Sequence, residues 1–229
     1  MNSVQEFYNN CGFPGPYSKE SLQWLDKNMA NPYINFIDRY LPLTNGKVLD
    51  AGCGTGLMCN FFAQRYPHNQ FTAIDFAKGI KYAAEYAQEH GISNIKFFEQ
   101  DILDLENSCI YDTVLCQGVL HHIPEYKQAL ARLHNQVSID GTLIVGLYHP
   151  LGKILKKFVD IDYYGNDILY QDQEHNVYET CYTKQQVISH NAHWQLLDMW
   201  PRYPLLHFVL NPLEYSKSGG LTIYAFKKK

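Results

Sequence analysis

The stretch that decides the fold is KVLDAGCGTG, residues 47–56. Its first half, Lys47–Ala51, is a short apolar run that predicts a buried strand. Its second half alternates glycine with small residues, which predicts a tight turn where a ligand can approach bare backbone N–H groups. Leu57 and Phe61, four residues apart, then begin a helical pattern that ends near Tyr66. This succession of strand, glycine turn and helix is typical of a parallel α/β sheet that binds a ligand at its strand ends.

The rest of the chain continues this alternation. Four further strands are predicted downstream at Gln70–Asp75, Ile95–Glu99, Tyr111–Cys116 and Thr142–Tyr148. Amphipathic helices are expected between them, around Ile80–Ala87 with a stop at Gly91, and after Pro124. The last predicted elements are a helix capped by Thr183 that runs to about His190 and two strands, Trp194–Trp200 and Leu221–Phe226. The pattern predicts one sheet covered by helices on both faces.

Two acidic residues follow strands at positions that suit a nucleoside. Asp75 ends the second strand, where a carboxylate can accept two hydrogen bonds from the vicinal hydroxyls of a ribose. Asp101, with apolar Ile102 beside it, follows the third strand and suits an adenine amino group and ring face.

Four segments carry a resemblance to a known family: VLDAGCGTG, the aspartate that ends AID, FFEQDI, and YDTVLCQGVLHHIP. They resemble the successive motifs of class I, Rossmann-like S-adenosylmethionine-dependent methyltransferases, in that family's order and at its usual intervals. The resemblance implies an α/β fold with a doubly wound, seven-stranded, mostly parallel sheet, in which the seventh strand is antiparallel and lies between the fifth and sixth. It also implies S-adenosylmethionine as the cofactor and S-adenosylhomocysteine as its product.

The cofactor-binding residues that the resemblance implies all lie at or just after the ends of predicted strands: Asp50, Gly52, Cys53, Gly54, Asp75, Phe76, Asp101, Ile102 and Gln117. The resemblance implies that the glycine turn packs along the methionine part of the cofactor. It also implies that Asp75 holds the ribose and that Asp101 and Ile102 frame the adenine. The backbone at Gln117 receives the methionine amino group, which Asp50 helps to orient.

The glycine turn has a rival interpretation, nicotinamide dinucleotide binding, which also uses a glycine turn and an acid. That fingerprint spaces its glycines as G-x-G-x-x-G, whereas this chain has G-x-G-x-G with Asp50 two residues ahead. The fingerprint also has no place for Asp101. The residues by themselves leave it open whether Asp50 only caps the glycine turn, and they favour packing over chemistry for Cys53.

Composition excludes several other classes. The formal net charge of −4 and the pI of about 6.2 argue against a nucleic-acid partner. The six cysteines lack C-x-x-C spacing, so we expect neither disulfides nor a metal site. No apolar run reaches the ~18 residues of a membrane span, and the polar start MNSVQEFYNN is unlike a signal peptide. These features predict a cytoplasmic protein that does not interact with a membrane.

We expect a single domain over residues 1–229, organised around a cofactor-binding core at 46–147. Residues 1–45 are predicted to form an N-terminal cap. The segments 148–182 and 201–220 follow strands, are longer than ordinary connections and are rich in tyrosine and histidine, so they predict a substrate lid. The 201–220 segment is also apolar enough to cover a partner surface, which leaves monomer and homodimer both open.

Candidate substrate and catalytic residues are the aromatic and histidine side chains near the predicted strand ends. The substrate-binding candidates are Tyr8, Tyr17, Tyr148, Tyr203 and His207. Methyl transfer needs a base only for some acceptors, and the candidates for that role are His121, His122 and His149. The paired histidines can instead orient other groups or contact the cofactor.

The leading functional hypothesis is methyl transfer to a small-molecule acceptor by in-line displacement. One alternative is a nucleic-acid or protein methyltransferase, which an open basic or extended groove would indicate. Another is a non-catalytic S-adenosylmethionine-binding module that regulates a partner, because the motifs concern cofactor binding only.

Overall fold

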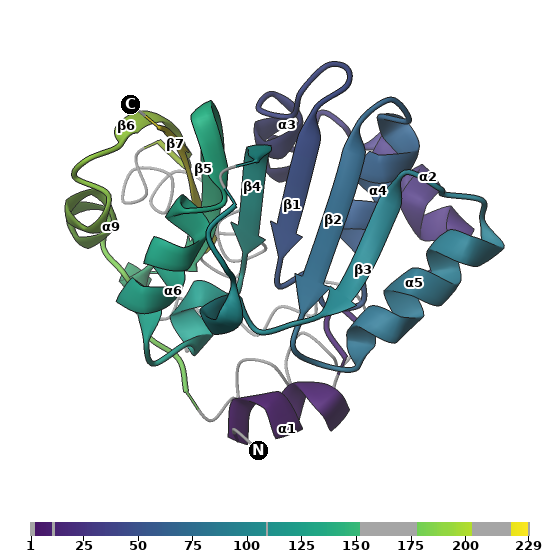
Figure 1. Cartoon of the computed structure of the whole chain (residues 1–229), viewed down its shortest axis with the longest axis horizontal. Coiled ribbons are helices and arrows are strands. Elements are labelled where there is room, and N and C mark those ends of the chain that lie inside the picture. The colour runs from purple at the N-terminus through teal and green to yellow at the C-terminus, as the bar shows by residue number, and fades with distance from the viewer. Residues whose placement is uncertain (1–2, 11, 109, 152–177, 203–220, 229) are drawn as a thin grey trace.

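Seven strands form one sheet in the order β3-β2-β1-β4-β5-β7-β6 in this computed structural model, which describes residues 3–10, 12–108, 110–151, 178–202 and 221–228 (Figure 1). The strands are β1 Lys47–Ala51, β2 Gln70–Asp75, β3 Ile95–Glu99, β4 Tyr111–Gln117, β5 Val137–Tyr148, β6 Gln195–Trp200 and β7 Leu221–Lys227. β7 runs antiparallel to β5 and β6, while β1 to β5 pair in parallel. The predicted doubly wound, seven-stranded, mostly parallel sheet is confirmed, including the place of its antiparallel strand.

Helices cover both faces of this sheet. They are α1 Ser3–Asn10, α2 Lys19–Lys27, α3 Pro32–Asp38, α4 Leu57–Arg65, α5 Gly79–Glu89, α6 Tyr126–His134 and α9 Lys184–His190, with 3₁₀ turns η1 Ile102–Asp104 and η2 Leu120–His122. One buried cluster joins α2, α3, α4 and α5 to one face of the sheet. A second joins α6 and α9 to the other face.

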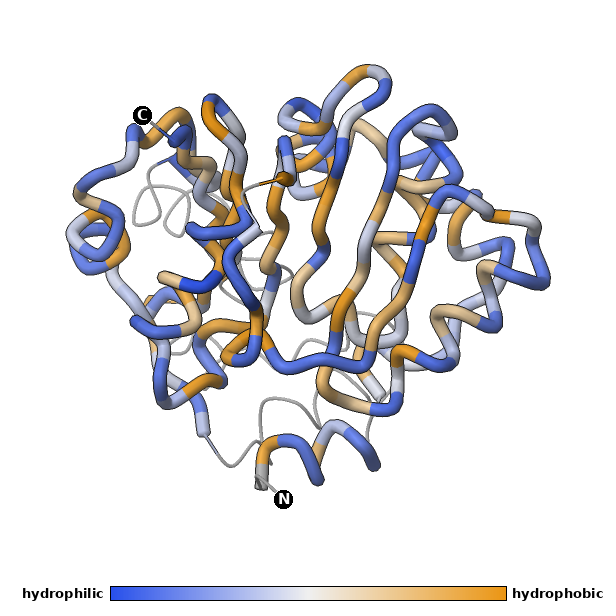
Figure 2. Tube along the Cα trace, viewed as in Figure 1, coloured by the Kyte–Doolittle hydropathy of each residue, from blue (hydrophilic) through white to orange (hydrophobic). Residues whose placement is uncertain are grey.

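Alternation along the strands divides the apolar side chains between these two clusters. In β1, Val48 belongs to the first cluster and Leu49 to the second. In β5, Ile144 faces the first cluster, whereas Leu143 and Val145 face the second. Figure 2 shows the result as strongly hydrophobic strand centres between more hydrophilic helices. Because both faces are buried, the parallel strands read as nearly continuous apolar runs.

Most predicted elements lie within one or two residues of their observed bounds, but β5 was predicted too short. It begins at Val137, five residues before the expected start at Thr142. Asp140 adopts a left-handed backbone conformation with φ of 63°. The β4–β5 pairing shifts register there, so that the expected turn is an irregularity within one strand.

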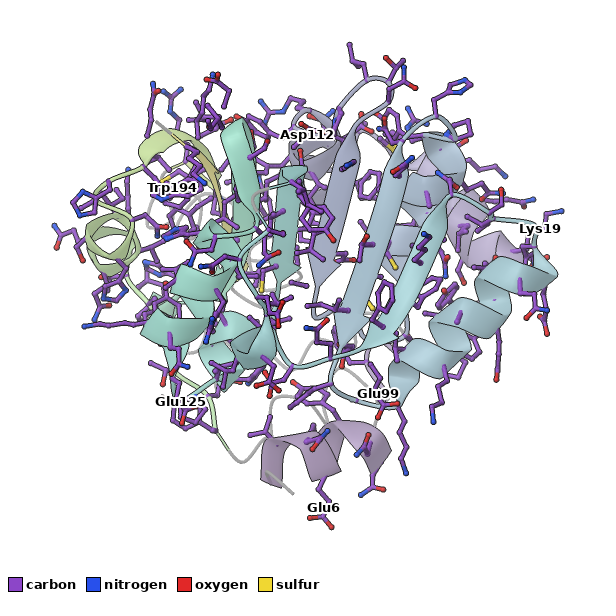
Figure 3. The ribbon with its side chains drawn as sticks, in the orientation of Figure 1. Glu6, Lys19, Glu99, Asp112, Glu125 and Trp194 are labelled. Carbon is purple, nitrogen blue, oxygen red and sulfur yellow. The ribbon has the colours of Figure 1, made fainter. Side chains whose placement is uncertain are left out.

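The N-terminal helix α1 lies across the ends of the strands, below the sheet in Figure 1. Two hydrogen bonds hold it there: Gln5 Nε2 donates to the Phe76 carbonyl at 2.8 Å, and Asn9 Oδ1 accepts from Lys78 N at 2.8 Å. Glu6 points away from the sheet (Figure 3). The opposite side of α1, with Val4 and Tyr8, therefore faces the strand ends.

Candidate active site

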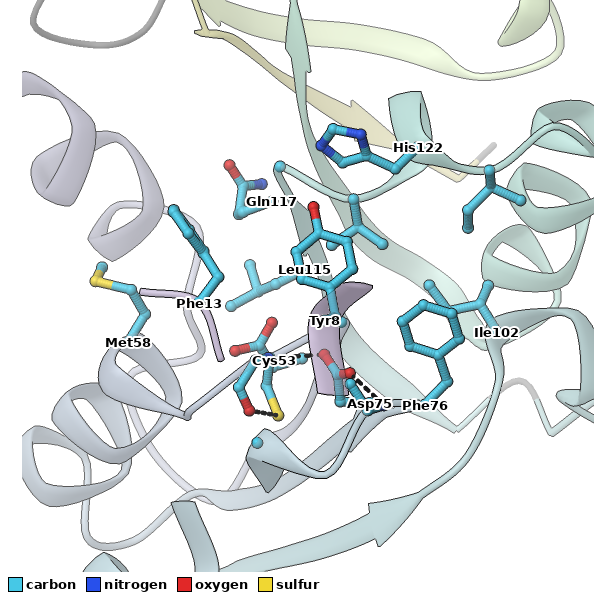
Figure 4. A pocket seen from close by; sticks show the side chains of 18 of the residues that line it. Tyr8, Phe13, Cys53, Met58, Asp75, Phe76, Ile102, Leu115, Gln117 and His122 are labelled. Carbon is cyan, nitrogen blue, oxygen red and sulfur yellow. Dashed lines mark hydrogen bonds between the residues drawn. The ribbon is translucent and has the colours of Figure 1, made fainter. Parts of the chain in front are cut away.

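A cavity opens at the carboxyl ends of β1, β2, β3 and β4 and is covered by the N-terminal residues (Figure 4). Its wall includes every residue that the motifs associated with the cofactor: Asp50, Gly52, Cys53, Gly54, Asp75, Phe76, Asp101, Ile102 and Gln117. Parallel strands place their carboxyl ends along one edge of the sheet. This brings Asp50 and Gln117, which are 67 positions apart in the chain, to the same cavity.

The glycine turn needs glycine for two separate reasons. Gly52 and Gly54 have φ values of 85° and 57°, in the left-handed region that disfavours other residues. A Cβ on Gly54 would also overlap the carbonyl oxygen of Phe13, which accepts a 2.8 Å hydrogen bond from Thr55 N. The turn is thus closed on one side by the N-terminal segment and lines the cavity on the other. The expected bare N–H groups are not found, because each N–H of residues 52–56 donates a hydrogen bond within the protein.

Asp75 is buried at the end of β2 and braces the glycine turn. One carboxylate oxygen accepts from Gly54 N at 2.8 Å and the other accepts from Ala77 N at 2.8 Å. Each oxygen has two lone pairs, so one on each remains for a ligand in the cavity. Burial raises the pKa of this carboxyl, while the backbone hydrogen bonds from Ala77 and Gly54 act in the opposite direction.

Asp50, at the end of β1, is buried like Asp75, but its carboxylate lacks the backbone hydrogen bonds that Asp75 accepts. Among the residues that the structure describes, none donates a hydrogen bond to its carboxylate. Burial and then the nearby charge of Asp75 raise the pKa of Asp50 to about 7. A buried carboxyl of this kind is poised to lose its proton when a cation arrives.

The ends of β3 and β4 supply the remaining polar groups. Asp101 accepts from Leu103 N at 2.9 Å and begins the short turn η1, while Ile102 is buried beside it. At the end of β4, Gln117 Nε2 donates to the Ile144 carbonyl at 3.1 Å. Its Oε1 is buried and has no hydrogen-bond partner in the described part of the chain.

A family model described as "Methyltransferase domain" matches residues 43–203, more than two thirds of the chain. The chain belongs to this family. The match spans all the strands that contribute to the cavity, and the predicted family is confirmed.

Curated relatives of this methyltransferase domain include two named enzymes. It is 29% identical over 125 residues to malonyl-[acyl-carrier protein] O-methyltransferase of Bacillus anthracis, which covers 54% of the chain and 46% of the relative. It is 36% identical over 106 residues to a ubiquinone biosynthesis O-methyltransferase of Paracidovorax citrulli, with 44% of each covered. The chain thus spans less than half the length of these relatives.

Solved structures share the fold over almost the whole chain. Magnesium protoporphyrin IX methyltransferase of Synechocystis PCC 6803 with bound SAM has a TM-score of 0.66 at 17% identity and covers 99% of this chain and 95% of its own. The [4+2]-cyclase SpnF has a TM-score of 0.63 at 17% identity, with 98% and 93% covered. Because these identities are low, the likeness concerns the fold of the methyltransferase domain.

The three histidine candidates occupy different environments in the methyltransferase domain. His122 lines the cavity, and its Nδ1 lies 3.0 Å from the Tyr178 carbonyl. A carbonyl only accepts, so Nδ1 carries the proton and Nε2 is the basic nitrogen of the neutral ring. His121 is fully buried against Tyr148, with ring centroids 4.0 Å apart, and His149 is also outside the cavity wall.

The substrate-binding candidates are similarly divided. Tyr8 lines the cavity, with its ring between those of Phe76 and His122 at 6.4 and 6.0 Å. Tyr17 instead lies in the core, where its hydroxyl accepts a 2.6 Å hydrogen bond from Asn60 Nδ2. Tyr148 packs on His121 outside the cavity wall.

The predicted lid falls largely outside the described residues. This applies to Tyr203 and His207 and to most of the segments 148–182 and 201–220. The described ends of the first segment lie close together, because Tyr182 N donates to the Tyr148 carbonyl at 2.9 Å.

Sequence reasoning missed one side of the cavity. Six apolar residues from α3, α4 and β4 line it: Tyr33, Ile37, Leu57, Met58, Phe62 and Leu115. The i,i+4 pairs in α4 were the available signal, but the same spacing also predicts ordinary helix packing. Only the position of α3 beside α4 shows which of these side chains face a ligand.

Two further properties concern the described part of the chain. It has no group of three or more histidine, cysteine or acidic side chains arranged to hold a metal ion. Within the same residues, none of the helices has the length and apolar character required to cross a membrane.

Proposed function

We propose that this chain is an S-adenosylmethionine-dependent methyltransferase that acts on a small-molecule acceptor. One observation carries the proposal: a single cavity joins the glycine turn, the carboxylates of Asp75 and Asp101, and the end of β4. The structure shares its fold with enzymes whose names describe methyl transfer, but also with a named cyclase. The side chains in the cavity, more than the fold, therefore support the activity.

The residues of the cavity fit the proposed cofactor. Asp75 offers the lone pairs that a ribose diol needs, and Asp101 with Ile102 offers an acceptor beside an apolar surface for adenine. Asp50 is a buried acceptor suited to an ammonium group, and the backbone of Gln117 at the end of β4 is the second acceptor that we expect for it. Desolvated acceptors of this kind are costly without a ligand, which supports a site for one.

When bound, S-adenosylmethionine supplies an electrophilic methyl group on a sulfonium. Positive charge is dispersed during the transfer, so alignment and exclusion of water are the main tasks of the protein. Helix α1 and Phe13 line the outer part of the cavity, where they would shield a bound cofactor from water. His122 is the best-placed of the three histidines to take a proton from an O–H or N–H acceptor.

Binding of S-adenosylhomocysteine, measured by calorimetry on the wild type, Asp75→Ala and Asp104→Ala, tests the proposal. Loss of the Asp75 carboxylate is expected to weaken binding by ~1–3 kcal/mol, the cost of a lost charged hydrogen bond. Asp104 is an exposed acid on the neighbouring η1, so its variant is a matched control with unchanged affinity. Equal affinities for all three proteins would contradict the cofactor site.

Catalysis is tested with methyl-labelled cofactor and fractionated small-molecule extract, in which label is expected to reach a low-mass product. Cofactor binding without transfer to any fraction would favour the regulatory module. Retention on duplex DNA or tRNA at physiological salt, with steep salt dependence, would favour a nucleic-acid substrate instead. The acidic net charge supports the small-molecule alternative.

A further inference from the structure

The cavity continues beyond the glycine turn into a space between α3 and α4. We call this space the apolar lobe and define it by Tyr33, Ile37, Leu57, Met58, Phe62 and Leu115. Figure 4 shows Met58 and Phe13 on one side of the cavity and Phe76 and Ile102 on the other. Met58 of the lobe therefore lies across the cavity from Phe76 and Ile102, on the side away from the expected adenine position.

Charge is distributed unevenly over the cavity wall. The acidic side chains in its described part are Asp50, Asp75, Asp101 and Glu125, and no lysine or arginine of the described residues lines it. None of the four acids belongs to the apolar lobe. Among the described residues, an anionic group there would find no cation to pair with, and it would lose its hydration, which costs several kcal/mol even after relaxation.

The proposed cofactor leaves this lobe available. Its ribose and adenine suit the ends of β2 and β3, where Asp75 and Asp101 lie. Its methionine arm carries an ammonium and a carboxylate, both of which need polar partners. Asp50 and Gln117 lie at the ends of β1 and β4, whereas the lobe offers side chains that are almost entirely hydrocarbon.

We propose that the apolar lobe is the acceptor subsite and that it binds an uncharged aliphatic or aromatic part of the acceptor. This inference rests on the proposed function. The exposed faces within the lobe come mainly from Tyr33, Leu57 and Met58, which are partly buried, above the fully buried Phe62 and Ile37. A methionine and a tyrosine in such a wall adapt to flat or branched apolar groups.

Methyl groups of methionine give a direct test, because the chain has four methionines and Met58 lies in the lobe. Protein labelled with ¹³C at the methionine methyls is first saturated with S-adenosylhomocysteine and then titrated with 4-methylphenol or with phenyl phosphate. The neutral probe is expected to shift the Met58 signal with saturation, while phenyl phosphate leaves it in place. Met199, buried on the opposite face of the sheet, is the internal reference.

Variants then separate the lobe from the rest of the cavity. Met58→Glu is expected to weaken 4-methylphenol binding about tenfold, whereas Met58→Leu, which keeps the apolar volume, retains it. Met29→Leu is the matched control, because Met29 packs on the same buried cluster but does not line the cavity. Ligand-observed saturation transfer measures the affinity in each variant.

The outcomes distinguish this inference from the proposed function. Absence of S-adenosylhomocysteine binding would overturn the proposed function itself. If that ligand binds but the neutral probe leaves Met58 unmoved, or phenyl phosphate shifts it equally, the apolar acceptor subsite is wrong. If S-adenosylhomocysteine alone shifts Met58 and blocks the neutral probe, the lobe belongs to the cofactor and the inference is likewise overturned.

Discussion

The two sides of the cavity are built in different ways. The side formed by the ends of β2 and β3 is polar and internally braced, with the Asp75 carboxylate bonded to two backbone N–H groups. The side formed by α3 and α4 is apolar, and its shape depends on how two helices pack on the sheet. Strand ends hold a few hydrogen-bond acceptors at fixed positions. The helices shape the volume of the cavity, which can differ among relatives that methylate different substrates.

Between these two sides lie His122 and Tyr8, from η2 and α1. Their ring centroids lie 6.0 Å apart, and we propose that the methyl group passes near them from one side of the cavity to the other. The comparison therefore predicts that changes at these two residues affect turnover, changes at the polar side affect cofactor affinity, and changes in the apolar lobe affect acceptor choice.

The largest effect is expected for His122→Asn. If His122 removes the acceptor's proton, kcat falls by about a hundredfold or more, while S-adenosylhomocysteine affinity is unchanged. His68→Asn, at an exposed histidine, is the control. The measurement is labelled methyl transfer to an active extract fraction over a range of pH. Full activity of His122→Asn would rule out His122 as the base, whereas an equal loss in cofactor affinity would place His122 on the cofactor side.

A smaller effect concerns the pH dependence of folding. In the unfolded chain Asp50 titrates near ~4, but in the fold burial and the charge of Asp75 raise its pKa to about 7. As pH rises from ~4 to ~7, the unfolded chain loses this proton first, so the free energy of unfolding falls.

Asp50→Asn removes this titration. Without ligand the variant is expected to exceed the wild type by roughly 2–4 kcal/mol above pH 7, and to lose that advantage below pH 4. Urea unfolding of both proteins at several pH values measures the difference, with Asp104→Asn as the exposed control. Parallel pH curves for Asp50→Asn and the wild type would show that Asp50 is charged in the fold.

The smallest effect is expected for a change at the contact between the N-terminal cap and the glycine turn. Gly54→Ala introduces a Cβ against the Phe13 carbonyl. Because this contact displaces the glycine turn, in addition to the strain of a positive φ, we expect S-adenosylhomocysteine affinity to fall about tenfold. Gly91→Ala is the matched control, since Gly91 also has a positive φ of 68° but has nothing within 4 Å of the added carbon. Calorimetry is expected to show unchanged affinity for Gly91→Ala. Equal affinities for both variants would mean that the cap does not shape the glycine turn.

The sequence by itself determined the sheet and the polar side of the cavity. Apolar runs and helical periods located the strands, and a residue that directly follows a strand has its place fixed by the sheet edge, as Asp75 and Asp101 show. The bulge at Asp140 escaped prediction, because a left-handed aspartate near a glycine has the same local signature as a turn. Only pairing with β4 makes it part of a strand.

The tertiary structure alone decided which of the other candidates meet at the cavity. His121 and His122 are adjacent in the chain, yet one is buried against Tyr148 and the other faces the cavity. Tyr8 and Tyr17 are divided in the same way between cavity and core. Such choices depend on the packing of helices far apart in sequence, and local patterns of hydrophobicity carry no information about which neighbour a side chain will meet.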